Sequence, residues 1–206
     1  MDFSELVNAR HSVRQFETGV TISDQELQTI FEQVVASPSS FNLQHWQFVI
    51  VREPTRKTEL RSLSFGQAQV EQCSAVVLVC GNLNAHADAE RIYADSDAQM
   101  RDKYVPMIEG VYKGQLALQR EEAVRSGALA AMSLMYAARN RGWDCGPMIG
   151  FDADAVAAML DLPEHVVPVM MMVMGRAEGG RQPPRGYRRP LQEVVHFESF
   201  GQTTFK

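Results

Sequence analysis

The stretch ARHSVRQF, residues 9–16, is the unusual feature around which the chain is organised. Arginine side chains such as those of Arg10 and Arg14 can donate charge-assisted hydrogen bonds to a phosphate in a fixed geometry, and His11 and Ser12 lie between them with further donors. The stretch therefore predicts a binding site for a phosphate group. The alternative is a solvated basic turn, which is the commoner outcome for such a cluster taken alone.

The composition is that of an ordinary globular protein. The 206 residues fit a single domain, expected to span 1–206, with 45% hydrophobic and 22% charged residues. The net charge of −5 argues against a nucleic-acid partner. No secretory signal pattern opens the chain, and the apolar stretch 166–174 is too short to span a bilayer, so no membrane association is expected. The three widely spaced cysteines form no disulfide or metal signature, which favours a cytoplasmic protein.

Local patterns predict several helices and strands. Ser23 and Glu26 form a capping box ahead of apolar residues at helical spacing, and Pro54 suits the first position of another helix. The run AVVLVC is continuously apolar, as in a strand that is buried on both faces. We expect helices over 4–9, 23–36, 54–63, 119–141 and after Asp152, and strands over 47–52, 75–80 and 166–174.

The longest helical pattern covers residues 119–141 and is rich in small side chains. Rows of apolar and small residues on more than one side indicate a central helix, possibly at a subunit interface. The polar segment 84–115 is expected to form helices with irregular links that cover a site, and its irregularly spaced acidic residues favour a solvated face over a metal site. The tail 191–205 lacks a core of its own and is expected to dock on something, such as a partner subunit.

Three further segments are candidates for ligand contact. SPSSFNLQHW, residues 37–46, is a polar loop between a helix and a strand, although its side chains also suit a plain turn. FGQAQ, residues 65–69, places two amides near a glycine; two unremarkable surface glutamines are the commoner outcome. GWDCGPMIGF, residues 142–151, is expected to be a loop whose glycines allow close approach to a ligand. No paired base is evident for Cys145, which favours a structural thiol.

Several common site motifs are absent from the sequence. No GxGxxG follows a strand, and GxxxxGK[ST], HExxH and GxSxG do not occur. A phosphate would therefore be held without a glycine-rich loop.

Four segments in this order resemble the flavin-dependent nitroreductase family. They are ARHSVRQF at 9–16, PSSFNLQHW at 38–46, GWDCGPMIGF at 142–151 and RRPLQEVV at 188–195, and the resemblance extends from about residue 4 to residue 200. His45 departs from the Pro-Trp pair often found in the family, Ile149 stands where some relatives carry Glu, and Gly186 stands where some carry Lys. These departures leave the nicotinamide and substrate preference open.

The resemblance implies an α+β fold: a mixed central sheet flanked by helices, with the long helix at the interface of an obligate homodimer and the C-terminal tail extending onto the partner. It also implies one FMN at each of two interface sites. By position, the phosphate and pyrimidine side would be held by Arg10, His11, Ser12, Arg14 and Arg188. The flavin loop would be Pro38, Ser39, Ser40 and Asn42, with its serines and asparagine coming from the partner. Gln67 or Gln69 would meet the polar edge of the flavin, and its face and N5 side would be lined by Pro147, Met148 and Gly150.

The implied activity is ping-pong transfer of electrons from NADH or NADPH, through FMN, to a nitroaromatic, quinone or similar small electron-poor acceptor. No catalytic acid or base is implied, because the acceptor's oxygens can take protons from solvent. Other redox substrates known in the family, as for enone reductases, dehalogenases and dehydrogenases, remain open. So do a non-catalytic flavin-binding sensor and a structural dimer whose arginines form salt bridges.

Overall fold

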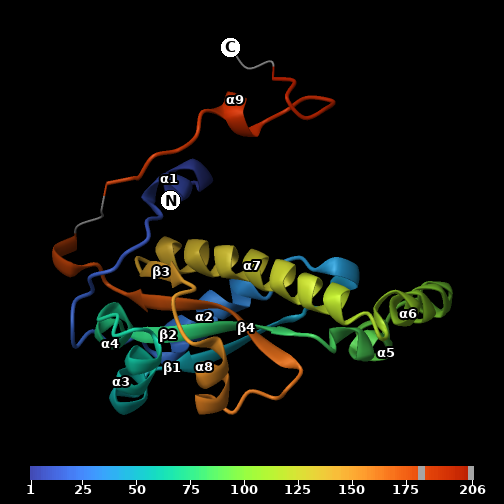
Figure 1. Cartoon of the computed structure of the whole chain (residues 1–206), viewed down its shortest axis with the longest axis horizontal. Helices are drawn as coiled ribbons and strands as arrows, with labels where there is room; N and C mark the ends of the chain where they lie inside the picture. Colours follow the sequence, from blue (N-terminus) through green and yellow to red (C-terminus); the bar gives the residue numbers. More distant parts are fainter. Residues whose placement is uncertain (181–183, 204–206) are drawn as a thin grey trace.

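The computed structural model describes residues 1–180 and 184–203, which form an α+β fold, as expected. A four-stranded sheet carries helices on both faces (Figure 1). The strands are β1 (Trp46–Val51), β2 (Ala75–Asn82), β3 (Asp144–Met148) and β4 (Val166–Gly175). The α-helices are α1 (Phe3–Ala9), α2 (Asp24–Val34), α3 (Pro54–Leu63), α4 (Gln69–Gln72), α5 (Ala89–Ile92), α6 (Ala98–Tyr112), α7 (Leu116–Asn140), α8 (Ala153–Met159) and α9 (Leu191–Val194). Short 3-10 turns are η1 (Ser40–Asn42), η2 (Ala85–Asp88) and η3 (Glu178–Gly180).

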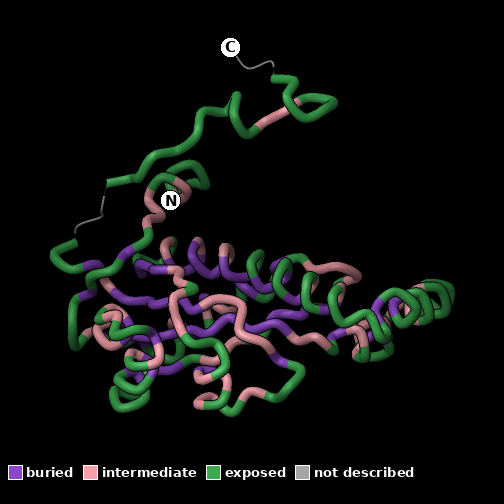
Figure 2. The backbone as a smooth tube through the Cα atoms, viewed as in Figure 1, coloured by how far each residue is buried: buried purple, intermediate pink, exposed green. Residues whose placement is uncertain are grey.

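The sheet has the strand order β1-β2-β4-β3, and every ladder between these strands is antiparallel. A mixed sheet was expected, and the parallel pairing in the described chain is an isolated bridge between Ser12 and Cys145, outside the ladders between the four strands. Alternate residues of β2 face opposite layers, Val77 toward α2 and α7 and Val76 toward α3, α4 and α8. The burial of both faces of this strand, expected from its apolar run, is therefore confirmed (Figure 2).

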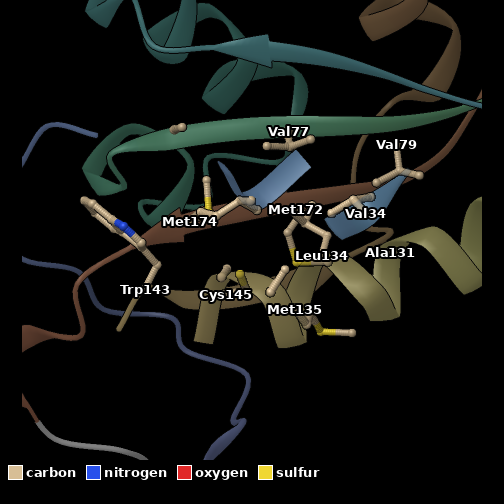
Figure 3. Packing of buried hydrophobic residues seen from close by; sticks show 14 of the residues in the cluster. Val34, Val77, Val79, Ala131, Leu134, Met135, Trp143, Cys145, Met172 and Met174 are labelled. Atoms are coloured by element: carbon tan, nitrogen blue, oxygen red, sulfur yellow. The ribbon is translucent and has the colours of Figure 1, made fainter. Parts of the chain in front are cut away.

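The layer between α7 and the sheet is packed with methionine, valine and alanine side chains (Figure 3). Small residues are needed here because α7 lies close against the strands. A Cβ on Gly81 would come within 2.8 Å of the Ala123 Cβ, and one on Gly127 within 3.0 Å of Val169. The close packing predicted for this helix is confirmed on the side that faces the sheet. Packing on a second side stays a prediction, because Val124 and Leu129 are 40% and 48% exposed.

Local capping signals set the helix starts. Ser23 accepts from the Glu26 amide at 3.2 Å while the Glu26 carboxylate accepts from the Ser23 amide at 3.1 Å, so the predicted capping box is confirmed. Pro54 is the first residue of α3, as expected, and Asp152 caps α8 by accepting from the Ala155 amide. None of the helices in the described ranges is long and apolar enough to cross a membrane.

The prediction of a loop over 142–151 was wrong in its central part. Residues 144–148 form β3, which pairs with β4 along one side at the edge of the sheet. The sequence around Gly146 and Pro147 suggested a loop, because glycine and proline are both unfavourable inside most strands. An edge strand tolerates a proline, since one side of it needs no further ladder hydrogen bonds, and the glycine admits a neighbouring backbone.

The segment 84–115 forms η2, α5 and α6 at one end of the molecule (Figure 1), confirming the expected helices with irregular links. It has its own small core, which includes Leu43 and Tyr112. The tail beyond residue 184 leaves the sheet and its helices, and Phe200 is 92% exposed. Docking of this tail on a partner stays a prediction, and its expected last residue, Phe205, lies outside the described residues.

Candidate functional site

Two cavities adjoin along the segment 10–15. The larger, about 1150 Å³, is lined by 10–15, 178–179, 184–186 and Arg188. The smaller, about 350 Å³, is lined by 12–14, Gln67, Gln69, 146–150 and Val173. Both share Ser12, Val13 and Arg14, so one short segment forms a wall of each.

This segment is held in place by backbone contacts with β3 and with the chain that follows β4. The Val13 amide donates to the Cys145 carbonyl at 3.0 Å, and the Glu178 amide donates to the Gln15 carbonyl at 3.0 Å. Val13 and Phe16 are buried anchors, each 2% exposed. Because side chains alternate along an extended chain, Ser12 and Arg14 are exposed on either side of Val13.

Close approach of this segment requires glycine on β3. A Cβ on Gly146 would lie 2.3 Å from the Val13 carbonyl oxygen and 2.9 Å from Val173. Gly175 has a similar role, since its Cβ would come within 2.8 Å of the Phe16 ring. The glycines therefore allow the basic segment to lie directly on the sheet.

The larger cavity is strongly cationic. Arg10, Arg14, Arg185 and Arg188 line it, and Glu178 is the carboxylate among its described lining residues. Within 1–180 and 184–203, none of these four arginines forms an ion pair. Arginine side chains without carboxylate partners around one cavity suit an anionic ligand.

Arg185 was not predicted from the sequence, and the structure shows its role. One of its terminal nitrogens donates to the carbonyls of Val7, Asn8 and Arg10 at 3.1, 2.8 and 3.2 Å. A cation here offsets the negative end of α1 beside the larger cavity. The only sequence signal was a glycine-, proline- and arginine-rich segment, which does not reveal a contact with residues 175 to 178 positions away.

The two glutamines of the smaller cavity have different positions in the hydrogen-bond network. The Gln67 amide nitrogen donates to the Gly150 carbonyl at 2.7 Å and to the Ser64 carbonyl at 3.1 Å. The Gln69 amide nitrogen donates to the Gln67 side-chain oxygen at 3.0 Å, and no donor in the described chain reaches the side-chain oxygen of Gln69. Gln67 thus orients the turn that carries Gly150, while Gln69 keeps an acceptor for a ligand.

The structure does not bring Pro38, Ser39, Ser40 and Asn42 to either cavity. Ser39 accepts from the Gln44 amide at 2.8 Å, and Ser40 accepts from the Tyr112 hydroxyl at 3.0 Å. Asn42 has a positive φ of 54° and is exposed. In a single chain these residues therefore form a separate, ordered surface loop.

His45, next to this loop, is buried at 1% exposure. Its Nδ1 lies 3.2 Å from the Ser126 hydroxyl on α7. Burial lowers the pKa of His45 from its ordinary 6.5, with a smaller opposing effect from Glu122. The imidazole therefore acts as a neutral core group that joins the loop to α7.

Cys145 lies beneath the basic segment and is 3% exposed. Burial raises the pKa of its thiol to about 12. A thiol with this pKa is not a nucleophile near neutral pH, in keeping with the structural role expected for it.

Comparison with known proteins shows the same architecture elsewhere. The family model described as "Nitroreductase family" matches residues 7–176. The chain is 37% identical to "Putative NAD(P)H nitroreductase MhqN" of Bacillus subtilis, over 95% of this chain and 98% of that protein. A solved structure of a "putative nitroreductase" of Bacillus subtilis, ydfN, superposes with a TM-score of 0.91 at 37% identity, covering 95% and 98% of the two chains. A "putative nitroreductase in complex with FMN" from Exiguobacterium sibiricum superposes with a TM-score of 0.88 at 32% identity, covering 96% and 98%. The chain belongs to the Nitroreductase family.

Proposed function

We propose that this protein is an FMN-dependent NAD(P)H oxidoreductase that reduces small electron-poor acceptors such as nitroaromatics or quinones. The observation that carries the proposal is the pair of adjoining cavities. One is lined by four arginines without ion pairs in the described chain, and the other by two amides and apolar side chains. Their chemistry matches a ligand with a phosphate at one end and a planar heterocycle at the other.

The residues present fit FMN. Arg10, His11, Ser12 and Arg188 would hold the phosphate in the larger cavity. In the smaller cavity Gln69 would accept from the polar edge of the ring, and the apolar side chains of Pro147 and Met148 would cover its face. Gly150 would line the N5 side, on a turn positioned by Gln67.

When bound, FMN would supply two-electron transfer from NADH or NADPH to an acceptor. Arg14 lines both cavities and would place positive charge near bound FMN, which would favour the uptake of electrons. The apolar side chains of Pro147 and Met148 would restrict the access of water to this cavity. No side chain is assigned as a general acid, because nitro and quinone oxygens can take protons from solvent.

We further propose that the whole chain acts as one domain and forms a homodimer that completes each site. In a single chain, Ser39, Ser40 and Asn42 line neither cavity, while α7 exposes Val124 and Leu129. A second copy packed on this helix would bring its own loop to the cavities and cover the C-terminal tail. The cytoplasm is the proposed location, since all three cysteines are free and buried.

Two alternative functions predict different properties for this site. A structural dimer would use the four cavity arginines for salt bridges to the second subunit and would not take up FMN. A flavin-binding sensor would take up FMN but fail to oxidise NADH or NADPH. Anaerobic addition of either nicotinamide to the FMN-loaded protein separates the sensor from the enzyme, since only the enzyme bleaches the flavin bands.

The binding site is tested with Arg14→Ala and Arg188→Ala. A hydrogen bond to a charged group contributes about 1.5–3 kcal/mol, so each variant should bind FMN roughly 10- to 100-fold more weakly by fluorescence quenching. Arg141→Ala is the matched control, because Arg141 is exposed and lines neither cavity. Tight, stoichiometric FMN binding in both site variants would refute the assignment.

A further inference from the structure

The loop of residues 38–44, which precedes β1, has an unusual backbone conformation. Phe41, Asn42 and Gln44 have φ angles of 51°, 54° and 52°, although none of them is glycine. A positive φ brings Cβ too close to the following carbonyl oxygen, and it is rare for a bulky residue such as phenylalanine. Such a conformation persists only where contacts with the surrounding structure hold it, and it is often found at binding sites.

Two tyrosine hydroxyls from the covering helices provide these contacts. Tyr93, directly after α5, donates to the Phe41 carbonyl at 3.2 Å. Tyr112, the last residue of α6, donates to the Ser40 hydroxyl at 3.0 Å. Tyr112 is itself fixed, since it is 3% exposed and its carbonyl accepts from the Gln119 side chain at 2.7 Å. The loop is therefore tied at two adjacent residues to the small core beneath α5 and α6.

The same contacts leave the loop serines free to donate. The Ser39 hydroxyl accepts from the Gln44 amide at 2.8 Å, and the Ser40 hydroxyl accepts from Tyr112 at 3.0 Å. In the described chain no acceptor takes the proton of either serine. A hydroxyl that already accepts one bond keeps its proton for an acceptor atom of a ligand, such as a phosphate or carbonyl oxygen.

We propose that Tyr93 and Tyr112 are positioning residues, which hold the loop 38–44 of one subunit in the conformation that contacts FMN bound to the other subunit. This inference rests on the proposed function, in which that loop completes the FMN site. Neither tyrosine lines either cavity, so both act through Ser40 and the backbone of Phe41. When part of the population leaves the binding conformation, the apparent affinity falls by that fraction.

Tyr93→Phe and Tyr112→Phe each remove one hydroxyl and keep the aromatic ring. The net contribution of one hydrogen bond corresponds to about fivefold in an equilibrium constant. By fluorescence quenching, each variant should bind FMN about two- to fivefold more weakly than the parent, and the double variant about tenfold or more. The double variant should have the largest effect because neither tyrosine then opposes the strain in the loop.

Tyr104→Phe is the matched control. The Tyr104 ring lies in the same cluster, 5.6 Å from the Tyr93 ring and 6.4 Å from the Phe41 ring. Its hydroxyl forms no hydrogen bond with the residues that the structure describes. This variant should bind FMN as the parent does. Urea unfolding of all variants checks that each one is folded before FMN is added.

Mixed dimers give a readout that a purely structural role would not change. One subunit carries Arg14→Ala and Arg188→Ala, so the dimer keeps one intact cavity, and the two subunits are purified together through different affinity tags. The double tyrosine variant is placed either on the subunit with the intact cavity or on its partner. FMN binding should weaken only in the second arrangement, because the partner supplies the loop to the intact cavity.

The outcomes separate this inference from the proposed function. The inference alone is overturned if the double variant binds FMN within about twofold of the parent, while NADH or NADPH still bleaches the parent's flavin. It is also overturned if binding weakens when the tyrosine changes lie on the subunit with the intact cavity. A parent protein that is monomeric or takes up no FMN would overturn the proposed function together with it.

Discussion

Replacing Gly146 by alanine tests whether the basic segment lies on β3 as the structure shows. The added Cβ would stand 2.3 Å from the Val13 carbonyl oxygen and 2.9 Å from Val173. Real Cβ contacts essentially never fall below 3.0 Å, so the Val13 backbone must retreat by at least about 0.7 Å. That movement disrupts the 3.0 Å hydrogen bond from the Val13 amide to Cys145.

The magnitude follows from these two effects. Loss of one backbone hydrogen bond costs about 1 kcal/mol, and overpacking of a tight contact costs about 1–3 kcal/mol. We expect Gly146→Ala to lower the free energy of unfolding by about 2–4 kcal/mol. Displacement of Ser12 and Arg14, the neighbours of Val13, should also weaken FMN binding at least tenfold, since hydrogen bonds to charged groups are sensitive to geometry.

The assay is urea unfolding of the apoprotein at one fixed protein concentration, followed by FMN titration by fluorescence quenching. Gly110→Ala is the matched control, because Gly110 lies within α6 and a Cβ there would meet nothing within 4 Å. This control should stabilise the protein by about 0.5–1 kcal/mol, the usual cost of glycine inside a helix. If Gly146→Ala stays within about 0.5 kcal/mol of the parent and its FMN affinity changes less than twofold, the segment does not lie on β3 as described.

Two further predictions concern the groups that hold the site's surroundings. Arg185→Ala removes the donor to three carbonyls at the end of α1 and should weaken FMN binding about tenfold. Arg185→Lys should have an intermediate affinity for FMN, because it keeps the charge. Equal FMN affinity in the parent and the Ala variant would contradict this prediction. Burial lowers the pKa of His45 in the folded protein below its ordinary 6.5. Below pH 6.5 the unfolded chain therefore binds a proton at this residue while the folded protein does not. The contribution of His45 to stability is complete above pH 6.5 and is lost as the pH falls toward the folded-state pKa. His45→Gln should therefore lose less stability than the parent between pH 7.5 and 5.5 in urea unfolding, and identical losses would show that His45 does not titrate in this way.

The sequence was most informative where the physical cause is local. The capping box of Ser23 and Glu26, the proline that begins α3, and the continuous apolar run of β2 each involve residues within a few positions of one another. Such signals depend on backbone geometry and burial patterns that neighbouring residues set by themselves. The predicted helices and strands therefore agree with the structure to within a few residues, apart from β3.

The prediction failed where a residue's role depends on a distant partner. Gly146 and Pro147 look like loop residues in sequence, and only the sheet shows that they form an edge strand on which Val13 lies. Arg185 contacts carbonyls near residue 8, and Gln67 contacts Gly150; neither pairing has a local signature. These contacts arise from packing that brings remote backbone groups to one place.

The sequence by itself determined the residue types of the site: arginines, a serine and a histidine in one short segment, two amides in another, and a glycine-rich stretch in a third. The order of these segments along the chain resembles that of the Nitroreductase family, and this resemblance was enough to indicate the family. Only the tertiary structure decided how these segments meet, with Ser12, Val13 and Arg14 as the common wall of two cavities. The physical reason is that local patterns determine which elements form, whereas steric fit between distant backbones determines which of their side chains share a site.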